Sequence, residues 1–313
     1  MKRKILALFT ALTAIFACTA FFAACSEQEQ FNFILSDDGT YYICEAAKNT
    51  DTDTEIVIPS EYKDKPVGEV RNFWCDNLES VTIPDSVTKI GWQGFSGNTK
   101  LKNVSIGSGV KEIGEQAFGG CTALESIVIP DNVITIGEYA FDKCNNLKDI
   151  SLGKGITAIA SYTFNKCENL KTVVLPDNVK VINNSAFIES GIESITFGKG
   201  LTDIGEYAFR DCKNLKSITL PDNLKTIGNR AFFDCSGLET VVLGGKKEIT
   251  FGDNIFDSCP NFKGLFSKSS FEDWVESGSS APVKIHFYSE TEPTDDSCYY
   301  WHYVDEQITV WEN

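Results

Sequence analysis

The stretch LESIVIPDNVITIGEYAFDKCNN, residues 124–146, contains the pattern that decides the fold. Leu124, Ile127 and Ile129 alternate with polar residues, as they do in a strand with one buried face. The apolar and corner positions that follow are Val133, Ile136, Gly137, Ala140, Phe141 and Cys144. A single copy cannot bury this much apolar surface, so we expect it to stack against neighbouring copies.

Equivalent stretches recur along most of the chain, at steps of 23, 23, 23, 23, 22, 23, 23 and 24 residues. They start at Leu78, Leu101, Leu124, Leu147, Leu170, Ile192, Leu215, Leu238 and Phe262. A fixed period of this length indicates a repeat protein in which each copy contacts only its neighbours.

The pattern L-x-x-I-x-I-P-x-x-V-x-x-I-G-x-x-A-F-x-x-C resembles the BspA-like bacterial leucine-rich repeat family from residue 78 to about residue 265. The resemblance implies a leucine-rich repeat solenoid of the α/β horseshoe class, rich in strand and with little helix. Its parallel strands would form a concave face, and irregular or 3₁₀ turns would form the convex side. Asn98 and Ser190 stand where the pattern has cysteine.

The remaining segments are interpreted around this repeat region, which we place at residues 71–262. Residues 31–70 are expected to form an N-terminal hairpin cap and an irregular first repeat. Residues 263–290 are expected to form a C-terminal cap with a short helix at SSFEDWVE, and residues 291–313 an acidic linker and an aromatic tail. Caps of this kind cover the exposed end copies of a solenoid.

The chain begins with three basic residues and a long apolar run, which indicates an export signal over residues 1–24. FAAC, residues 22–25, resembles a bacterial lipobox, which implies cleavage before Cys25, lipid on that cysteine and a tether over residues 25–30. A signal cut elsewhere and lipidation at Cys18 are the alternatives. The expected location is the outside of the bacterial cell membrane, with secretion as the alternative.

Charge excludes several partners. Removal of residues 1–24 leaves 25 basic and 44 acidic residues, a formal net charge of −19. Nucleic-acid binding needs a basic surface, and attraction to anionic lipid needs basic clusters. We therefore expect no nucleic-acid partner, and contact with the membrane only through the lipid anchor.

Seven cysteines share one position of the repeat: Cys75, Cys121, Cys144, Cys167, Cys212, Cys235 and Cys259. Stacked strands lie about 4.8 Å apart, but parallel side-chain vectors do not converge as a disulfide requires. No CxxC-like pair suggests zinc. We interpret the column as small buried thiols that pack between copies, and leave the roles of Cys44 and Cys298 open.

A second period of 46 residues runs through the same copies. The turn after each strand alternates between PD and Gly-rich sequences, with middle residues such as Asp131 and Lys154. One strand position is always Glu or Lys, and the two alternate except at Lys148 and Lys171. Opposite charges across neighbouring strands are favourable. We interpret both rows as a charge-neutralised stack.

The sequence carries no arguable catalytic constellation. The chain has two histidines, His286 and His302, both outside the repeats, and no nucleophile elbow or dinucleotide fingerprint. We expect no enzyme activity, cofactor or metal.

Surfaces remain as the functional features. The candidate binding residues on the concave face are Ser126, Val128, Asp149, Ser151, Thr172, Val174, Ser194, Thr196, Ser217 and Thr219. They lack the aromatic and arginine side chains typical of tight hot spots, which indicates broad, weak contact. Tyrosines at the convex EYAF position are further exposed candidates: Tyr139, Tyr162 and Tyr207.

Two functions are compatible with these surfaces. The family resemblance implies adhesion, with a protein on host or neighbouring cells as partner. The alternative is binding of glycan or envelope polymer through an aromatic site in the tail: Tyr299, Tyr300, Trp301, Tyr303 and Trp311. A structural cap is a third interpretation of the same tail.

Overall fold

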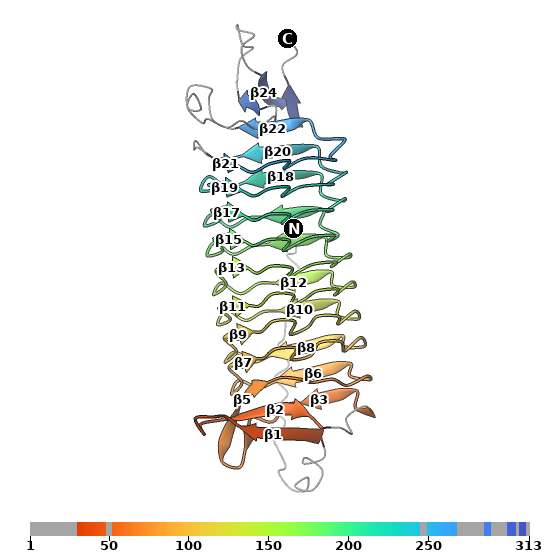
Figure 1. Cartoon of the computed structure of the whole chain (residues 1–313), viewed down its shortest axis with the longest axis vertical. Helices are drawn as coiled ribbons and strands as arrows, with labels where there is room; N and C mark the ends of the chain where they lie inside the picture. Colours follow the sequence, from red (N-terminus) through yellow and green to blue (C-terminus); the bar gives the residue numbers. More distant parts are fainter. Residues whose placement is uncertain are drawn as a thin grey trace, which may run out of the picture.

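The computed structural model describes residues 30–47, 52–244 and 249–267, and the backbone of three further strands at 285–288, 299–304 and 307–310. Within these ranges the chain is a stack of similar coils, made of strands and turns with almost no helix (Figure 1). The expected fold class, a strand-rich leucine-rich repeat solenoid, is confirmed.

Each coil contributes one longer strand to a column on one side of the stack (Figure 1). The strands of this long-strand column are β3 (Glu55–Val57), β6 (Ser80–Ile83), β8 (Asn103–Ile106), β10 (Ser126–Val128), β12 (Asp149–Ser151), β14 (Thr172–Val174), β16 (Ser194–Thr196), β18 (Ser217–Leu220), β20 (Thr240–Leu243) and β22 (Gly264–Ser267). Where neighbouring strands pair, they do so in parallel and in register, so that Ile127 lies opposite Ile150. Every inward residue therefore meets its counterpart in the next coil.

A second column of short parallel strands runs beside the first, and the sequence analysis did not anticipate it. It contains β5 (Lys65–Val70), β7 (Lys89–Ile90), β9 (Glu112–Ile113), β11 (Thr135–Ile136), β13 (Ala158–Ile159), β15 (Val181–Ile182), β17 (Asp203–Ile204), β19 (Thr226–Ile227) and β21 (Thr250–Phe251). Most of these strands are two residues long, too short to show the alternation by which strands are recognised. They are strands because each one forms backbone hydrogen bonds with the equivalent segment of a neighbouring coil.

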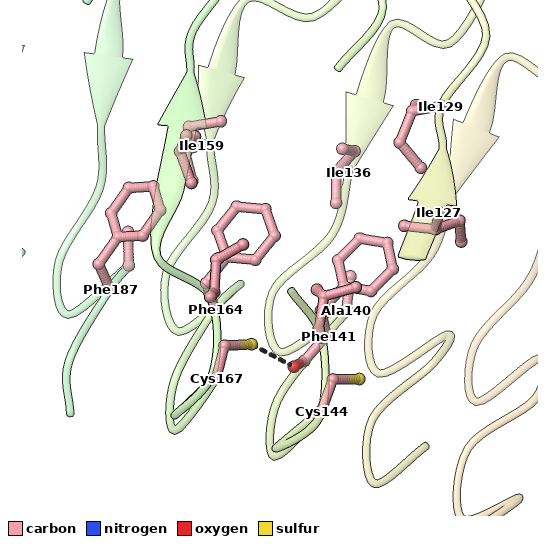
Figure 2. Close-up of a cluster of buried hydrophobic side chains, with 14 of the residues drawn as sticks. Ile127, Ile129, Ile136, Ala140, Phe141, Cys144, Ile159, Phe164, Cys167 and Phe187 are labelled. Atoms are coloured by element: carbon pink, nitrogen blue, oxygen red, sulfur yellow. Dashed lines mark hydrogen bonds between the residues drawn. The ribbon is translucent and has the colours of Figure 1, made fainter. Parts of the chain in front are cut away.

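Between the two columns lies one continuous core. Ile127, Ile136 and Phe141 are at most 3% exposed and point into the space enclosed by the coil (Figure 2). The rings of consecutive repeat phenylalanines stack along the axis, with centroids 5.1–5.7 Å apart from Phe95 to Phe256. These rings bury large apolar areas and make regular aromatic contacts, so the coils have a fixed spacing.

Special backbone geometry closes each coil. A Cβ added at Gly137 would lie 2.5 Å from the amide nitrogen of Glu115 in the preceding coil, so only glycine fits that corner. Tyr139 and Lys143 have φ of 57° and 56°. Hydrogen-bonded turns, such as that from the Asp142 amide to the Tyr139 carbonyl (3.0 Å), form the convex side.

Between β6 and β20 the long-strand column is divided into pairs of coils, with β3 joined to the first pair and β22 to the last. Pairing is present from β6 to β8, β10 to β12, β14 to β16 and β18 to β20, and absent between β8 and β10, β12 and β14, and β16 and β18. Each pair joins a PD turn to the Gly-rich turn after it. A Cβ on Gly153 would lie 2.2 Å from the carbonyl oxygen of Pro130. The glycine therefore permits the close contact within a pair.

Other strands flank the stack. At the N-terminal end, β1 (Phe31–Leu35) and β2 (Tyr42–Ala46) form an antiparallel hairpin, and β2 pairs in parallel with β5. The short β4 (Glu61–Tyr62) also pairs with β5. At the other end β22 is followed in the same sheet by β23 (Ile285–Tyr288), β24 (Tyr299–Val304) and β25 (Gln307–Val310). The expected helix at residues 269–276 lies outside the described residues.

Candidate functional site

The ten residues proposed for the concave face all lie on the outer surface of the long-strand column. β10, β14 and β16 each have an exposed, a buried and an exposed residue in succession, and the candidate residues are the exposed ones. Val128 and Val174 are 66% and 65% exposed. We call the outer surface of β10, β12, β14, β16 and β18 the long-strand face.

The polar side chains on the long-strand face point outward, toward solvent. In the part of the chain that the structure describes, the candidate serine, threonine and aspartate side chains make no recorded hydrogen bond or ion pair. The position of these hydroxyl and carboxylate groups is thus set only by the strand backbone, and the groups face solvent. This surface can form many weak polar contacts and a few apolar contacts, at Val128 and Val174.

One margin of the long-strand face carries ion pairs between successive coils. Four lysine–glutamate pairs have Nζ–Oε distances of 2.7–2.9 Å: Glu79–Lys102, Glu125–Lys148, Lys171–Glu193 and Glu239–Lys263. These side chains are 45–65% exposed, so water and salt screen the attraction and each pair adds little to stability. This row agrees with the charge-neutralised interpretation.

The turns on the other margin of the face are linked differently from what the sequence suggested. The backbone amide of Lys154 donates to Asp131 Oδ1 at 3.0 Å, and Asn178 Nδ2 donates to the Lys154 carbonyl at 2.6 Å. The same links recur at the Asp85–Ser108 and Asp177–Lys199 turns. The acceptor is a carboxylate but the donor is backbone, so the charge on Lys154 is not what joins these turns.

The cysteine column lies inside the stack. Of the seven repeat cysteines, Cys259 is partly buried and the other six are fully buried, and all seven are free thiols. The Cys167 thiol donates to the backbone carbonyl of Phe141 in the preceding coil, at 3.2 Å (Figure 2). Cys121, Cys144, Cys212, Cys235 and Cys259 make the same contact one coil apart.

Burial makes these thiols poor nucleophiles. It raises the pKa of Cys121 and of Cys212 to about 12, because a thiolate loses its hydration there. It also raises the pKa of Cys144 and of Cys167. Since the thiolate is both the nucleophile and the metal ligand, this environment favours neither role. No group of three potential metal-ligating side chains occurs among the described residues.

Asn98 and Ser190 explain what the cysteine position requires. Asn98 Nδ2 donates to the carbonyls of Phe73 (2.6 Å) and Phe95 (2.8 Å), and Ser190 Oγ lies 3.4 Å from Cys212 Sγ. Cysteine, asparagine and serine share a small size and a hydrogen-bond donor. The sequence indicated that this position requires a small side chain, but the need for a hydrogen-bond donor was missed. The presence of asparagine and serine at this position was the sequence feature that could have revealed it.

Convex tyrosines are partly buried and contact one another. The rings of Tyr139 and Tyr162 are stacked, with centroids 4.6 Å apart and planes 2° from parallel. Arg230 Nη1 donates to the Tyr207 hydroxyl at 2.6 Å. Contacts within the protein therefore cover part of each tyrosine side chain and leave less of it available to a ligand.

The other candidate residues cannot be placed in a site. Cys25 and Trp311 lie outside the described residues. Tyr299, Tyr300, Trp301 and Tyr303 are described through the backbone of β24, which pairs with β23. No helix of the described residues is long and apolar enough to cross a membrane.

Taken together, the parallel columns, the in-register coils and the stacked phenylalanines define a leucine-rich repeat solenoid. The family described as BspA type Leucine rich repeat region, in six copies, matches residues 70–192 and 181–277. The chain belongs to this family.

The chain is also similar to solved structures of bacterial proteins. A leucine-rich repeat protein from Bacteroides ovatus matches with a TM-score of 0.56 and 25% identity, over 77% of this chain and 70% of that chain. The leucine-rich repeat protein of T. pallidum matches with a TM-score of 0.44 and 25% identity, over 80% and 94% of the two chains. The pneumococcal vaccine antigen PcpA matches with a TM-score of 0.41 and 18% identity, over 88% and 92%. Comparison with the curated proteins finds no match.

Proposed function

We propose that this chain is a protein-binding scaffold for adhesion, displayed outside a bacterial cell and anchored through lipid on Cys25. The observation that supports binding is the long-strand face. Its side chains are exposed, spaced regularly along the stack and without partners among the described residues. The expected partner is a protein on host or neighbouring cells.

The composition of the face determines how it would bind. Tight interfaces depend on a few buried aromatic or arginine side chains, and the ten candidate residues include none. Affinity would come from many small contacts along a rigid surface, and multivalent display on a membrane would strengthen it. Lipid on Cys25 supplies such display, and mass spectrometry of the N-terminus of the purified protein tests it.

Binding through the long-strand face is tested by charge insertion. Replacing both exposed valines, Val128→Asp and Val174→Asp, places carboxylates in the middle of the face without changing the core. We expect adhesion of the purified chain to cells or matrix proteins to fall about tenfold or more, which corresponds to about 1.4 kcal/mol. Solid-phase binding measures it.

The matched control is Ile134→Asp, because Ile134 is 54% exposed and lies outside the long-strand face. Binding should survive this substitution. Equal loss in both variants would show a non-specific charge effect, and loss in neither would reject the face as the binding surface.

The glycan-binding alternative rests on the tail aromatics. Deleting residues 291–313 would remove β24 and expose the edge of β23, so single substitutions test the tail better. If Trp301→Ala or Tyr303→Ala abolishes cell binding while the two valine substitutions do not, the tail is the site.

A further inference from the structure

The long-strand face is hollowed at one of its strand gaps. Between β16 and β18, where the strands are not paired, lies an open groove of about 400 Å³. The residues that matter for its chemistry are Thr196, Phe197, Ser217, Thr219, Leu220 and Asp222. Its volume falls in the range of small-molecule sites, about 300–1,000 Å³.

An aromatic residue is found in this groove where other coils have aliphatic residues. Phe197 occupies the strand-end position that is Ile106 or Leu152 in the equivalent Gly-rich coils. Its ring is half-buried and packs edge-to-face on the core residue Phe209, with centroids 6.3 Å apart and planes at 84°. The groove therefore contains a partly exposed ring that is fixed by the core.

Polar groups complete the lining. Thr196, Ser217 and Thr219 contribute exposed hydroxyls, each able to donate and to accept, and Asp222 contributes an exposed carboxylate that accepts. No lysine or arginine is among the residues that line the groove in the described part of the chain. A phosphate, sulfate or acidic sugar would meet a carboxylate and no counter-charge.

We propose that this groove binds a neutral hexopyranose, as a free sugar or as one residue of a glycan. The pyranose ring has an apolar C–H surface for the partly exposed ring of Phe197, and its hydroxyls suit the surrounding hydroxyls and the Asp222 carboxylate. A purely apolar ligand would leave those groups unsatisfied, which is unfavourable. This site is separate from the tail aromatics, and it does not depend on whether the face binds a protein.

A second groove on the same face provides an internal comparison. It lies over β6, β8 and β10, with a volume of about 220 Å³. Ser80, Thr82, Asn103 and Val128 are among its lining residues, and neither an aromatic nor a carboxylate side chain is. It shares the strand gap and the hydroxyls but lacks the ring and the acceptor, so we expect it not to bind sugar.

The test uses the purified full-length chain in mild detergent, with glucose, galactose, mannose, N-acetylglucosamine and fucose as probes. Saturation-transfer NMR detects binding, and titration calorimetry measures it. We expect at least one of these neutral sugars to bind. Phe197→Leu should weaken its affinity about tenfold or more, because the ring is lost. Leucine already occupies this position in other coils, so the fold should be retained.

Thr219→Ala and Thr82→Ala form the matched pair, since both threonines hold the same strand position in their coils. Thr219→Ala should weaken sugar binding several-fold, and Thr82→Ala should leave it unchanged. The proposal is overturned if none of the neutral sugars binds, if sugar binding is insensitive to both Phe197→Leu and Thr219→Ala, or if an acidic sugar or a peptide occupies the groove instead.

Discussion

At the scale of single residues, the repeat cysteines are hydrogen-bond donors inside the core. Each thiol in the column from Cys121 to Cys259 contacts a phenylalanine carbonyl of the preceding coil. Because burial disfavours ionisation of a thiol, ionisation of the fully buried members would destabilise the column.

A pH dependence of stability follows from these thiols. The ordinary thiol pKa is 9.0, and that of folded Cys121 is about 12. As pH rises, the unfolded chain therefore loses this proton first. The contribution of Cys121 to stability is complete below pH 9 and falls by about 1.4 kcal/mol per unit between pH 9 and about 12. Urea unfolding at several pH values measures it.

The matched control is Cys121→Ser, which keeps a donor as Ser190 does and does not ionise in this range. Tyrosines and lysines titrate equally in both proteins, so the difference between the two slopes isolates one thiol. Parallel slopes above pH 9 would contradict the prediction.

Much of the residue-level picture could be read from the sequence. The ten candidate positions lie on the outer surface because strand side chains alternate between two faces. The donor role of the cysteine position could not be read in the same way. It depends on which carbonyl of the preceding coil lies opposite, and that is set by the stacking.

At the scale of elements, the turns after the long strands are in closest contact within a pair of coils, and asparagine side chains such as Asn178 link one pair to the next. Asp131 Oδ1 accepts from the Lys154 amide, and Gly153 lies against the Pro130 carbonyl. The alternation of PD and Gly-rich turns is thus a pattern of hydrogen bonding and close packing more than one of charge.

Two substitutions separate these explanations. Asp131→Ala removes the acceptor and should lower the free energy of unfolding by about 1 kcal/mol. Lys154→Ala keeps the donating amide and should change it by less than about 0.5 kcal/mol. Chemical denaturation of both variants is the measurement. If Lys154→Ala destabilises as much as Asp131→Ala, the side-chain charge matters after all.

At the scale of the whole molecule, the unit of stacking is two coils. Between β6 and β20 the long-strand column is paired within each of four two-coil units and unpaired at the three boundaries between them. The short-strand column and the phenylalanine stack continue across those boundaries, as from Asp203 to Thr226 and from Phe209 to Phe232. The short-strand column has its own gap, between β11 and β13, so the gaps in the two columns lie at different coils.

Deletions test the size of this unit. Removing residues 124–169 takes out two coils and leaves a Gly-rich turn followed by a PD turn, as in the native order. Removing residues 147–169 takes out one coil and places Pro176 where Gly153 packs against the Pro130 carbonyl. The smaller deletion should lower the melting temperature more, as followed by circular dichroism. The prediction is wrong if the protein that lacks one coil is at least as stable as the protein that lacks two.

The sequence by itself determined the repeat, its register and its family, because a 23-residue apolar period can be buried only by stacking. It also identified which strand residues face outward. The tertiary structure alone decided the second column of short strands, the donor role of the cysteines and the grooves on the long-strand face. These features depend on the distances between neighbouring coils. Those distances are set only when the side chains of two coils pack against each other.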